Sequence, residues 1–174
     1  EAIRDEDDRD RYQAVYAGDA SGSVAAPTAG LHFTPALLRT LETTGVRKAE
    51  VVLHVGTGTF KPVETEYVEQ HAMHEEWCTV PAETGVAIRA ARNSNGRIVA
   101  VGTTSARTLE SFSHDAVERG GECSTRILIT PGYTFTNVDV LMTNFHLPRS
   151  TLMAMVGAML HSPTHNGVER LKSI

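Results

Sequence analysis

The stretch RIVAVGTTSARTLESF, residues 97–112, decides the fold prediction for this chain. Its first part, up to Gly102, is a short apolar run that predicts a buried strand. The hydroxyl residues that follow begin a segment of helical spacing, with Leu109 and Phe112 on its inner side. A strand that passes directly into a helix is the repeating unit of α/β domains.

Similar transitions occur on both sides of this stretch. Thr34 is a favourable N-cap for a helix that begins at Pro35, and Gly45 suits its C-terminal end. Pro81 and Pro148 begin two further helical segments. The predicted helices are residues 35–44, 81–92, 103–112 and 148–160, and the predicted strands are residues 46–55, 97–102 and 125–130. This alternation predicts the α/β class, with helices around a mixed or largely parallel sheet.

The composition is that of a globular protein. Of 174 residues, 41% are hydrophobic and 21% are charged, which is too apolar for a disordered chain. No apolar run approaches the ~20 residues that a membrane span needs, so we expect no membrane partner and a cytoplasmic protein. Two cysteines, Cys78 and Cys123, are too few for a disulfide framework, and we expect them to be reduced and mostly buried.

The charge distribution leaves the question of a nucleic-acid partner open. The formal net charge is -5, but residues 1–10 hold six acidic residues against two arginines. The remaining residues carry 14 basic against 15 acidic side chains, which is close to neutral. Composition therefore neither supports nor excludes an RNA partner.

Two strand ends are candidate ligand sites. In open α/β sheets, ligands bind beyond the carboxyl ends of strands, where helix N-termini present free backbone N–H groups. We expect the segments after Val55 and Val101 and the segment around His146 to converge in one cleft. The residues at the two strand ends that can bind a carboxylate or ribose hydroxyls are Gly56, Thr57, Thr59, Thr103, Thr104, Ser105 and Arg107. Helix capping is the structural alternative for the hydroxyl run.

Three histidines lie beside glycine, proline or cap residues, where side chains are free to act on a ligand. His32, His54 and His146 are the candidates for proton transfer, because imidazole titrates near neutral pH. A structural histidine is the alternative for each. A pair three residues apart, His71 and His74, has no fourth ligand at local spacing, so we expect no metal site.

Six blocks carry a resemblance to a known family: APTAGLHFTPALL (26–38), LHVGTGTFKPV (53–63), HAMHEEW (71–77), VGTTSARTLES (101–111), PGY (131–133) and TNFHLPRSTL (143–152). Their order and spacing resemble the S-adenosylmethionine:tRNA ribosyltransferase-isomerase family of queuosine biosynthesis. The resemblance covers about residues 9–159. It implies transfer and isomerisation of the ribosyl part of S-adenosylmethionine onto 7-aminomethyl-7-deazaguanine at the wobble position of tRNA. The product is epoxyqueuosine, and adenine and methionine are released.

The resemblance also implies partners and further site residues. S-adenosylmethionine serves as co-substrate, no separate cofactor is expected, tRNA is the acceptor, and we expect a monomer. The matching blocks add Thr28, Gly30, Asn144, Arg149, Ser150 and Thr151 as candidate substrate-binding residues. Arg107 and Arg149 are the candidates for pairing with a carboxylate or an RNA phosphate.

Family members are longer than this chain and carry an additional β-barrel region on the N-terminal side. The resemblance therefore implies a fragment of a two-domain fold that lacks this region and the usual C-terminal tail. We interpret residues 1–20 as an acidic connector or partial helix, 21–160 as the α/β catalytic-type domain and 161–174 as an atypical tail. Two alternatives are a remnant that binds S-adenosylmethionine or RNA without turnover, and an unrelated small nucleotide-binding α/β enzyme.

Overall fold

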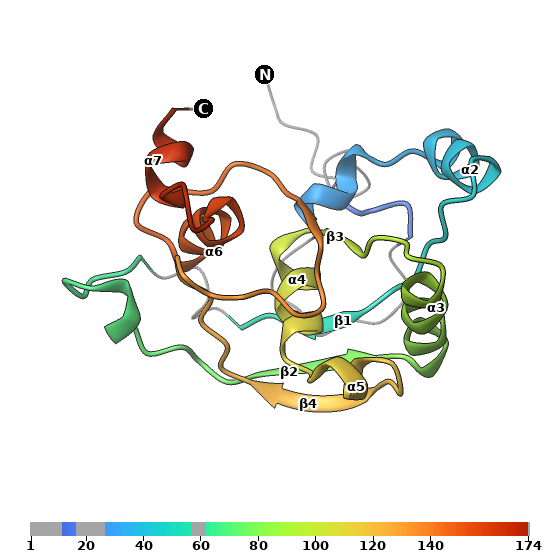
Figure 1. The fold of residues 1–174 in the computed structure, drawn as a ribbon, viewed down its shortest axis with the longest axis horizontal. Coiled ribbons are helices and arrows are strands. Elements are labelled where there is room, and N and C mark those ends of the chain that lie inside the picture. The colour runs from blue at the N-terminus through green and yellow to red at the C-terminus, as the bar shows by residue number, and fades with distance from the viewer. Residues whose placement is uncertain (1–11, 17–26, 57–61, 174) are drawn as a thin grey trace, which may run out of the picture.

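The computed structural model describes residues 12–16, 27–56 and 62–173 (Figure 1). Its short 3-10 helices are η1 (Thr28–His32) and η3 (Val68–Gln70). The α-helices are α2 (Pro35–Thr43), α3 (Ala82–Asn93), α4 (Thr103–Glu110), α5 (His114–Val117), α6 (Thr151–Leu160) and α7 (Gly167–Lys172). The strands are β1 (Val52–His54), β2 (Glu76–Val80), β3 (Val99–Val101), β4 (Gly121–Thr125) and β5 (Val140–Met142).

The strands of the described residues form two small sheets. One is antiparallel with the order β1-β2-β4, and the other is the parallel pair β3-β5. The α/β class is confirmed, and both pairing senses are present, but the single sheet expected from the sequence is divided in two. The antiparallel sheet leaves one face open, since Val52 and Trp77 are 41% and 45% exposed. A sheet of this kind needs apolar residues only on its inner face.

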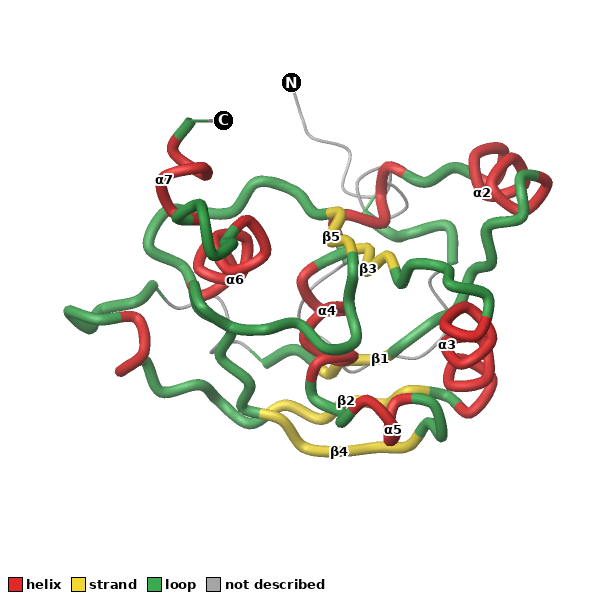
Figure 2. The backbone as a smooth tube through the Cα atoms, in the orientation of Figure 1, coloured by secondary structure: helices red, strands yellow, loops and turns green. Residues whose placement is uncertain are grey.

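Helix α4 is the centre of the fold. It contacts β1 and β2 on one side and β3 and β5 on the other, and Figure 2 shows it between the two sheets. Its fully buried Ala106 belongs to the hydrophobic core together with Leu53 of β1, Val80 of β2 and Met155 of α6. The helix therefore carries its N-terminal hydroxyl run and Arg107 into the middle of the molecule.

The predicted helices are confirmed, with small changes at their ends. Thr34 caps α2, because its Oγ1 accepts a hydrogen bond from the N–H of Leu37 at 3.1 Å. The last predicted helix begins at Thr151 rather than Pro148, because Ser150 is the N-cap of α6 and Arg149 has a φ of 58°. None of the described helices has the length and apolarity that would let it cross a membrane.

Two predicted strands are wrong in extent. Of the strand predicted for residues 46–55, only β1 is present. The Glu50 carbonyl oxygen accepts a hydrogen bond from Thr84 Oγ1 at 2.6 Å instead of from a neighbouring strand. The prediction for residues 125–130 is displaced, since β4 ends at Thr125. There the Ile127 N–H donates to Thr125 Oγ1 at 3.1 Å, and the chain leaves the ladder. Ile129 is buried without strand pairing, so its apolar character reflects the core.

Candidate functional site

The parallel pair β3-β5 brings two sequence motifs together. Parallel strands end at the same edge of a sheet, so residues 102–107 and 143–151 begin side by side. The Gly102 N–H donates to the Met142 carbonyl oxygen at 2.8 Å, just past the strand ends. Gly102 has a φ of 91°, a conformation that suits glycine and turns the chain into α4. The segment after Val101 and the segment around His146 therefore lie at one edge of the sheet, as expected from the sequence.

A third motif lies against this edge. A Cβ atom placed on Gly102 would lie 3.9 Å from the Cβ of Ala29 in η1, and Figure 2 shows η1 beside the end of β5. Thr28 and His32, the two ends of η1, are exposed. Gly30 is buried, and a Cβ there would overlap the Tyr16 hydroxyl, so close packing accounts for this glycine.

The segment after Val55 reaches α4 through a buried ion pair. The Gly56 N–H donates to Glu76 Oε1 at 3.1 Å, and Glu76 Oε2 lies 2.5 Å from Arg107 Nη2. The side chains of Glu76 and Arg107 are 0% and 3% exposed. Gly56 is thereby fixed on the α4 side of the sheet. Thr57 and Thr59 lie outside the described residues, so their part of the expected cleft stays a prediction.

His146 has the environment of a neutral imidazole. Its Nε2 lies 3.0 Å from the hydroxyl of Thr143, the first residue after β5. The side chain is half-buried, and desolvation lowers the pKa of His146 below its ordinary value. The ring is therefore predominantly neutral at pH 7, which is the state that can accept a proton.

The other two candidate histidines are placed differently. His54 lies across from Trp77 in the antiparallel sheet and is exposed on the face opposite Leu53 and the core. Because α4 packs on the core side, the sheet separates His54 from the residues gathered around α4. His32 is exposed at the end of η1, the 3-10 helix whose Ala29 lies beside Gly102.

Several candidate hydroxyls have structural partners. Ser105 Oγ donates to the Val101 carbonyl oxygen at 2.8 Å. Ser150 caps α6: its Oγ accepts from the Met153 N–H at 3.2 Å and donates to the Leu147 carbonyl oxygen at 2.7 Å. Both serine hydroxyls therefore have a structural role at the start of a helix, as in the alternative given for them above. The remaining candidates at this edge are the buried Thr103, the half-buried Thr104 and Asn144, and the exposed Arg149.

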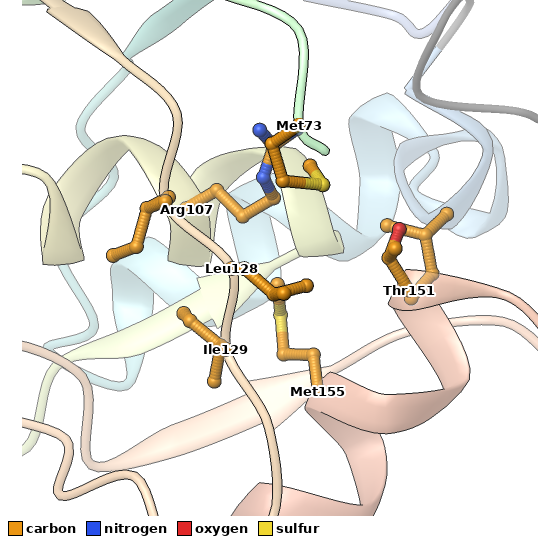
Figure 3. Close-up of a pocket in the computed structure, with 8 residues that line it drawn as sticks. Met73, Arg107, Leu128, Ile129, Thr151 and Met155 are labelled. Carbon is orange, nitrogen blue, oxygen red and sulfur yellow. The ribbon is translucent and has the colours of Figure 1, made fainter. Parts of the chain in front are cut away.

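A narrow recess joins α4 and α6. Figure 3 shows Arg107 of α4, Thr151 and Met155 of α6, and Met73 around it. Among the described residues, Arg107 Nε and Thr151 Oγ1 are buried without a hydrogen-bond partner. The space between these side chains is too small to hold a water molecule, so the recess is closed in this structure. A ligand group can reach the two unpaired polar atoms only when these side chains move apart.

Glu76 is not among the site residues predicted from the sequence. This carboxylate lies in the HAMHEEW block, of which the sequence motif singled out only the histidines. A usable signal was present, because Glu76 and Cys78 are two apart in a strand and therefore face the same side. A buried cysteine next along that face indicates that the glutamate is buried too, and a buried carboxylate needs a cation or several hydrogen-bond donors around it.

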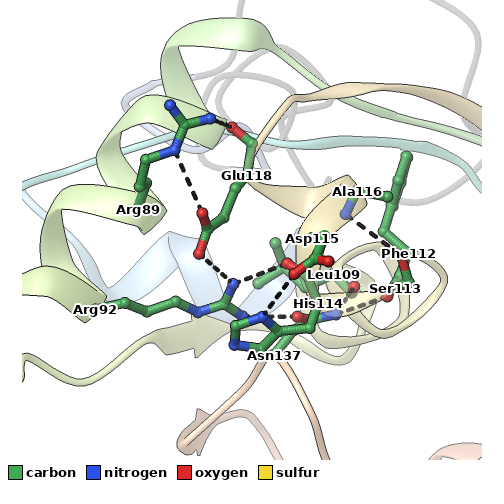
Figure 4. A network of polar contacts seen from close by, with 10 residues as sticks. All are labelled: Arg89, Arg92, Leu109, Phe112, Ser113, His114, Asp115, Ala116, Glu118 and Asn137. Atoms are coloured by element: carbon green, nitrogen blue, oxygen red, sulfur yellow. Dashed lines mark hydrogen bonds and ion pairs between the residues drawn. The ribbon is translucent and has the colours of Figure 1, made fainter.

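The far end of α4 is fixed by a second polar network (Figure 4). Arg92 of α3 donates to Glu118 Oε1 at 2.9 Å and to Asn137 Oδ1 at 2.7 Å. The hydrogen bond from Arg92 is the largest cause that lowers the pKa of Glu118. Asn137 Nδ2 in turn donates to the carbonyl oxygens of Leu109 and Phe112, at 2.7 and 2.8 Å. These contacts tie Asn137 to the carbonyl oxygens at and just beyond the end of α4.

Glu110, the last residue of α4, accepts hydrogen bonds from several residues of the segment that leads into β5. Its carboxylate accepts from the Tyr133 hydroxyl at 2.9 Å and from the N–H groups of Asn137 and Val138 at 2.8 and 2.9 Å. The N–H of Thr136 donates to it as well, at 3.0 Å. Burial and the neighbouring Glu110 charge raise the pKa of Tyr133. Glu110 thus sets the approach of β5, and with it the place of His146.

We expect Glu110→Gln to lower the free energy of unfolding by about 1–3 kcal/mol. The amide keeps one acceptor oxygen but turns an NH2 group toward N–H donors, which leaves buried polar groups unpaired. Urea unfolding followed by circular dichroism measures the change. Glu122→Gln is the matched control: Glu122 is exposed in β4, so a change within about 0.5 kcal/mol is expected. Equal effects of both substitutions would contradict the role assigned to Glu110.

The described residues hold no group of three or more His, Cys, Asp or Glu side chains arranged to hold a metal ion. The segment of residues 71–75, which carries His71 and His74, is irregular rather than helical. The polar groups that gather near α4 are instead hydroxyls, one imidazole and an ion pair. Such a set can bind a polar organic molecule and move a proton.

Comparisons with known proteins decide the family. The model of the family described as queuosine biosynthesis protein matches residues 1–167, nearly the whole chain. The chain belongs to the queuosine biosynthesis protein family. This assignment overturns the alternative of an unrelated small nucleotide-binding enzyme and confirms the resemblance seen in the sequence blocks.

Relatives within the queuosine biosynthesis family are named S-adenosylmethionine:tRNA ribosyltransferase-isomerase. The protein from Thiobacillus denitrificans is 54% identical over 96% of this chain and 46% of its own length. The protein from Rhodospirillum rubrum is 58% identical over 89% of this chain and 46% of its own length. The solved structure of S-adenosylmethionine tRNA ribosyltransferase from Thermotoga maritima is 41% identical, with a TM-score of 0.64 over 83% of this chain and 45% of that one. The chain thus spans about half the length of these relatives.

Proposed function

We propose that this chain is the part of an S-adenosylmethionine:tRNA ribosyltransferase-isomerase that carries its proton-transfer histidine. The reaction moves the ribosyl group of S-adenosylmethionine onto 7-aminomethyl-7-deazaguanine in tRNA and isomerises it to epoxyqueuosine. Adenine and methionine leave. The observation that carries the proposal is identity of 50–58% to relatives named for this activity, over most of the chain.

The chemistry requires a base near a positively charged sulfur. A sulfonium acidifies the protons on its neighbouring carbons, so a neutral imidazole is strong enough to remove one of them. His146 meets this requirement, because burial favours its neutral form and Thr143 orients its ring. His32 is the second candidate, since it lies on the exposed end of η1 near the same edge. His54 ranks last because the sheet separates it from α4.

The substrate contacts follow from the charges at the site. Arg107 is already neutralised by Glu76, so an incoming carboxylate or phosphate would compete with a buried ion pair. Arg107 Nε and Thr151 Oγ1 instead suit a neutral polar group, such as a ribose hydroxyl, once the side chains between α4 and α6 move apart to admit it. Arg149 is exposed beside the α6 N-terminus and is the better partner for an RNA phosphate.

The wider assignments are parts of the same proposal. S-adenosylmethionine acts as co-substrate, without a separate cofactor, and the protein is a cytoplasmic monomer. Residues 1–20 act as connector, 21–160 as the catalytic-type domain and 161–174 as a tail. The remaining binding candidates are Thr28, Gly30, Gly56, Thr57, Thr59, Thr103, Thr104, Ser105, Asn144 and Ser150.

The test is an incubation with S-adenosylmethionine and an anticodon stem-loop that carries 7-aminomethyl-7-deazaguanine. Free adenine is measured by chromatography, and the digested RNA is analysed by nucleoside mass spectrometry. The same assay is run on a chimera in which this chain replaces the matching segment of the Thiobacillus denitrificans relative. Adenine and epoxyqueuosine from the chimera support the proposal. Calorimetric binding of S-adenosylmethionine without adenine release indicates the non-catalytic remnant, and neither product nor binding contradicts both.

RNA affinity gives a separate prediction for the isolated chain. Outside its first ten residues the chain is near neutral, so it offers little net attraction to phosphates. We expect a Kd for the stem-loop weaker than about micromolar in physiological salt, weakening further as salt is raised. Fluorescence anisotropy of a labelled stem-loop at two salt concentrations measures both. Tight binding that salt does not change would contradict this expectation.

A further inference from the structure

Two free thiols face each other across the antiparallel sheet. Cys78 of the central strand β2 is directly paired with Cys123 of the edge strand β4. Their sulfur atoms lie 3.2 Å apart, and the Cys78 thiol also lies 3.3 Å from the Cys123 carbonyl oxygen. The expectation of two free thiols is confirmed, but the sequence separation of 45 residues gave no sign that they are neighbours.

The backbone geometry at this pair is that of a disulfide. Directly opposed residues of antiparallel strands have Cα atoms about 4.5–5.5 Å apart. Disulfide-bonded cysteines have Cα atoms about 4.4–6.8 Å apart. Both sulfur atoms project from the same face of the sheet, since they are in contact. A bond between them therefore requires rotation of side chains and no shift of the strands.

The two thiols differ in access to a reagent. Cys78 is fully buried, and desolvation, followed by the hydrogen bond with Cys123, raises the pKa of its thiol to about 12. Cys123 is half-buried on an edge strand, which has no neighbour on its other side among the described residues. Of the two thiols, Cys123 is therefore the one that an external reagent can reach first. The Cys78 sulfur is then close enough to attack the modified Cys123 sulfur.

We propose that Cys78 and Cys123 form a modification site, at which a small disulfide oxidant converts the dithiol into a cross-strand disulfide. The Cys123 thiolate attacks one sulfur of oxidised glutathione, which forms a mixed disulfide and releases one glutathione thiolate. The Cys78 sulfur then attacks the Cys123 sulfur, the bond from Cys123 to glutathione breaks, and the Cys78 proton passes to the departing glutathione sulfur. The dithiol is oxidised by two electrons, and one oxidised glutathione becomes two reduced molecules.

The disulfide would fasten the strand that organises the candidate site. Glu76, which holds Gly56 and Arg107, lies two residues before Cys78 on the same face of β2. Oxidation ties this strand covalently to the sheet edge and closes a long loop of chain. We therefore expect a higher Tm for the oxidised protein, and a return to the original value after treatment with dithiothreitol.

The experiment uses the folded chain and oxidised glutathione. After incubation, the protein is unfolded, alkylated with iodoacetamide and weighed by mass spectrometry. The expected product is a monomer that has lost two hydrogens, takes up no alkyl group and yields one linked peptide pair after proteolysis. Two alkylated thiols after prolonged incubation would overturn the proposal, as would a disulfide between two chains.

Single substitutions separate the two roles. Cys78→Ser removes the resolving thiol, so the mixed disulfide with glutathione should accumulate on Cys123. Cys123→Ser leaves only the buried thiol, which should stay unmodified in the folded protein and become alkylated once it is unfolded. Glutathione on Cys78 in the folded Cys123→Ser protein would overturn the assigned order of attack. The result with the unsubstituted chain decides the proposal even if one variant does not fold.

Discussion

Arg107→Met is expected to lower the free energy of unfolding by about 3–5 kcal/mol, the cost of removing one partner from a buried ion pair. The substitution takes the Arg107 guanidinium away from the Glu76 carboxylate, in a place where neither side chain is more than 3% exposed. Urea unfolding, monitored by the far-ultraviolet circular dichroism of the chain, measures the effect. The surface pair of Arg126 and Glu75 is the matched control, because its side chains are 70% and 54% exposed. Arg126→Met should cost at most about 1 kcal/mol.

The double variant Glu76→Gln with Arg107→Met tests the cause. It removes the carboxylate charge together with the cation, while Gln keeps an oxygen for the Gly56 N–H. We expect at least half of the lost stability to return, because the buried carboxylate charge is removed together with the Arg107 cation. No recovery would show that packing of the Arg107 stem, and not charge, accounts for the loss. A double variant that is stable but binds S-adenosylmethionine less tightly would support a substrate contact by Arg107.

His146→Gln is expected to lower the rate of adenine release by about 10²–10⁴-fold, the usual contribution of a general acid or base. An amide has the shape to keep a hydrogen bond with Thr143 but cannot accept a proton near pH 7. The rate is measured in the chimera under saturating S-adenosylmethionine, with Tm as the control for folding. If the folded variant keeps more than about a tenth of the rate, His146 is structural and His32 becomes the candidate base.

The same histidine predicts a pH profile. Because burial lowers the pKa of His146, its neutral form persists to lower pH than that of an exposed histidine. The rate should stay level above neutrality and fall only as the pH drops through this lowered pKa. His54→Gln is the matched substitution, since His54 lies on the open face of the sheet. The His54→Gln variant should keep both the rate and the pH profile. A large loss of rate in this variant would indicate that the reacting groups lie on the open face of the sheet and not on the α4 side.

Local sequence determined the helices and several caps. Thr34, Ser150 and Gly102 act on residues within a few positions of themselves, through side-chain caps or a special φ angle. Such interactions are written into short stretches of chain, so they can be predicted without knowing the rest of the fold. The sequence blocks also predicted the family, because long runs of unusual residues in fixed order seldom arise by chance.

Strand limits and sheet arrangement were decided by tertiary contacts. Residues 46–51 and 126–130 have the composition of strands, yet their backbone groups bond to side chains such as those of Thr84 and Thr125. A strand exists only where a second strand supplies a ladder, and the position of that partner is not encoded locally. For the same reason the division into an antiparallel sheet and a parallel pair could not be read from the alternation of elements.

The candidate site divides along the same line. Residue chemistry and loop position in the sequence predicted His146 as one of three candidate histidines, together with the motifs around it. Only the tertiary structure placed His54 on the other face of the sheet, joined Gly56 to Arg107 through Glu76, and brought Cys78 against Cys123. Each of these outcomes depends on contacts between residues that are far apart in the sequence. Such contacts decide which polar groups are buried and which are paired, so burial and pairing are determined by the packed fold and not by the residue itself.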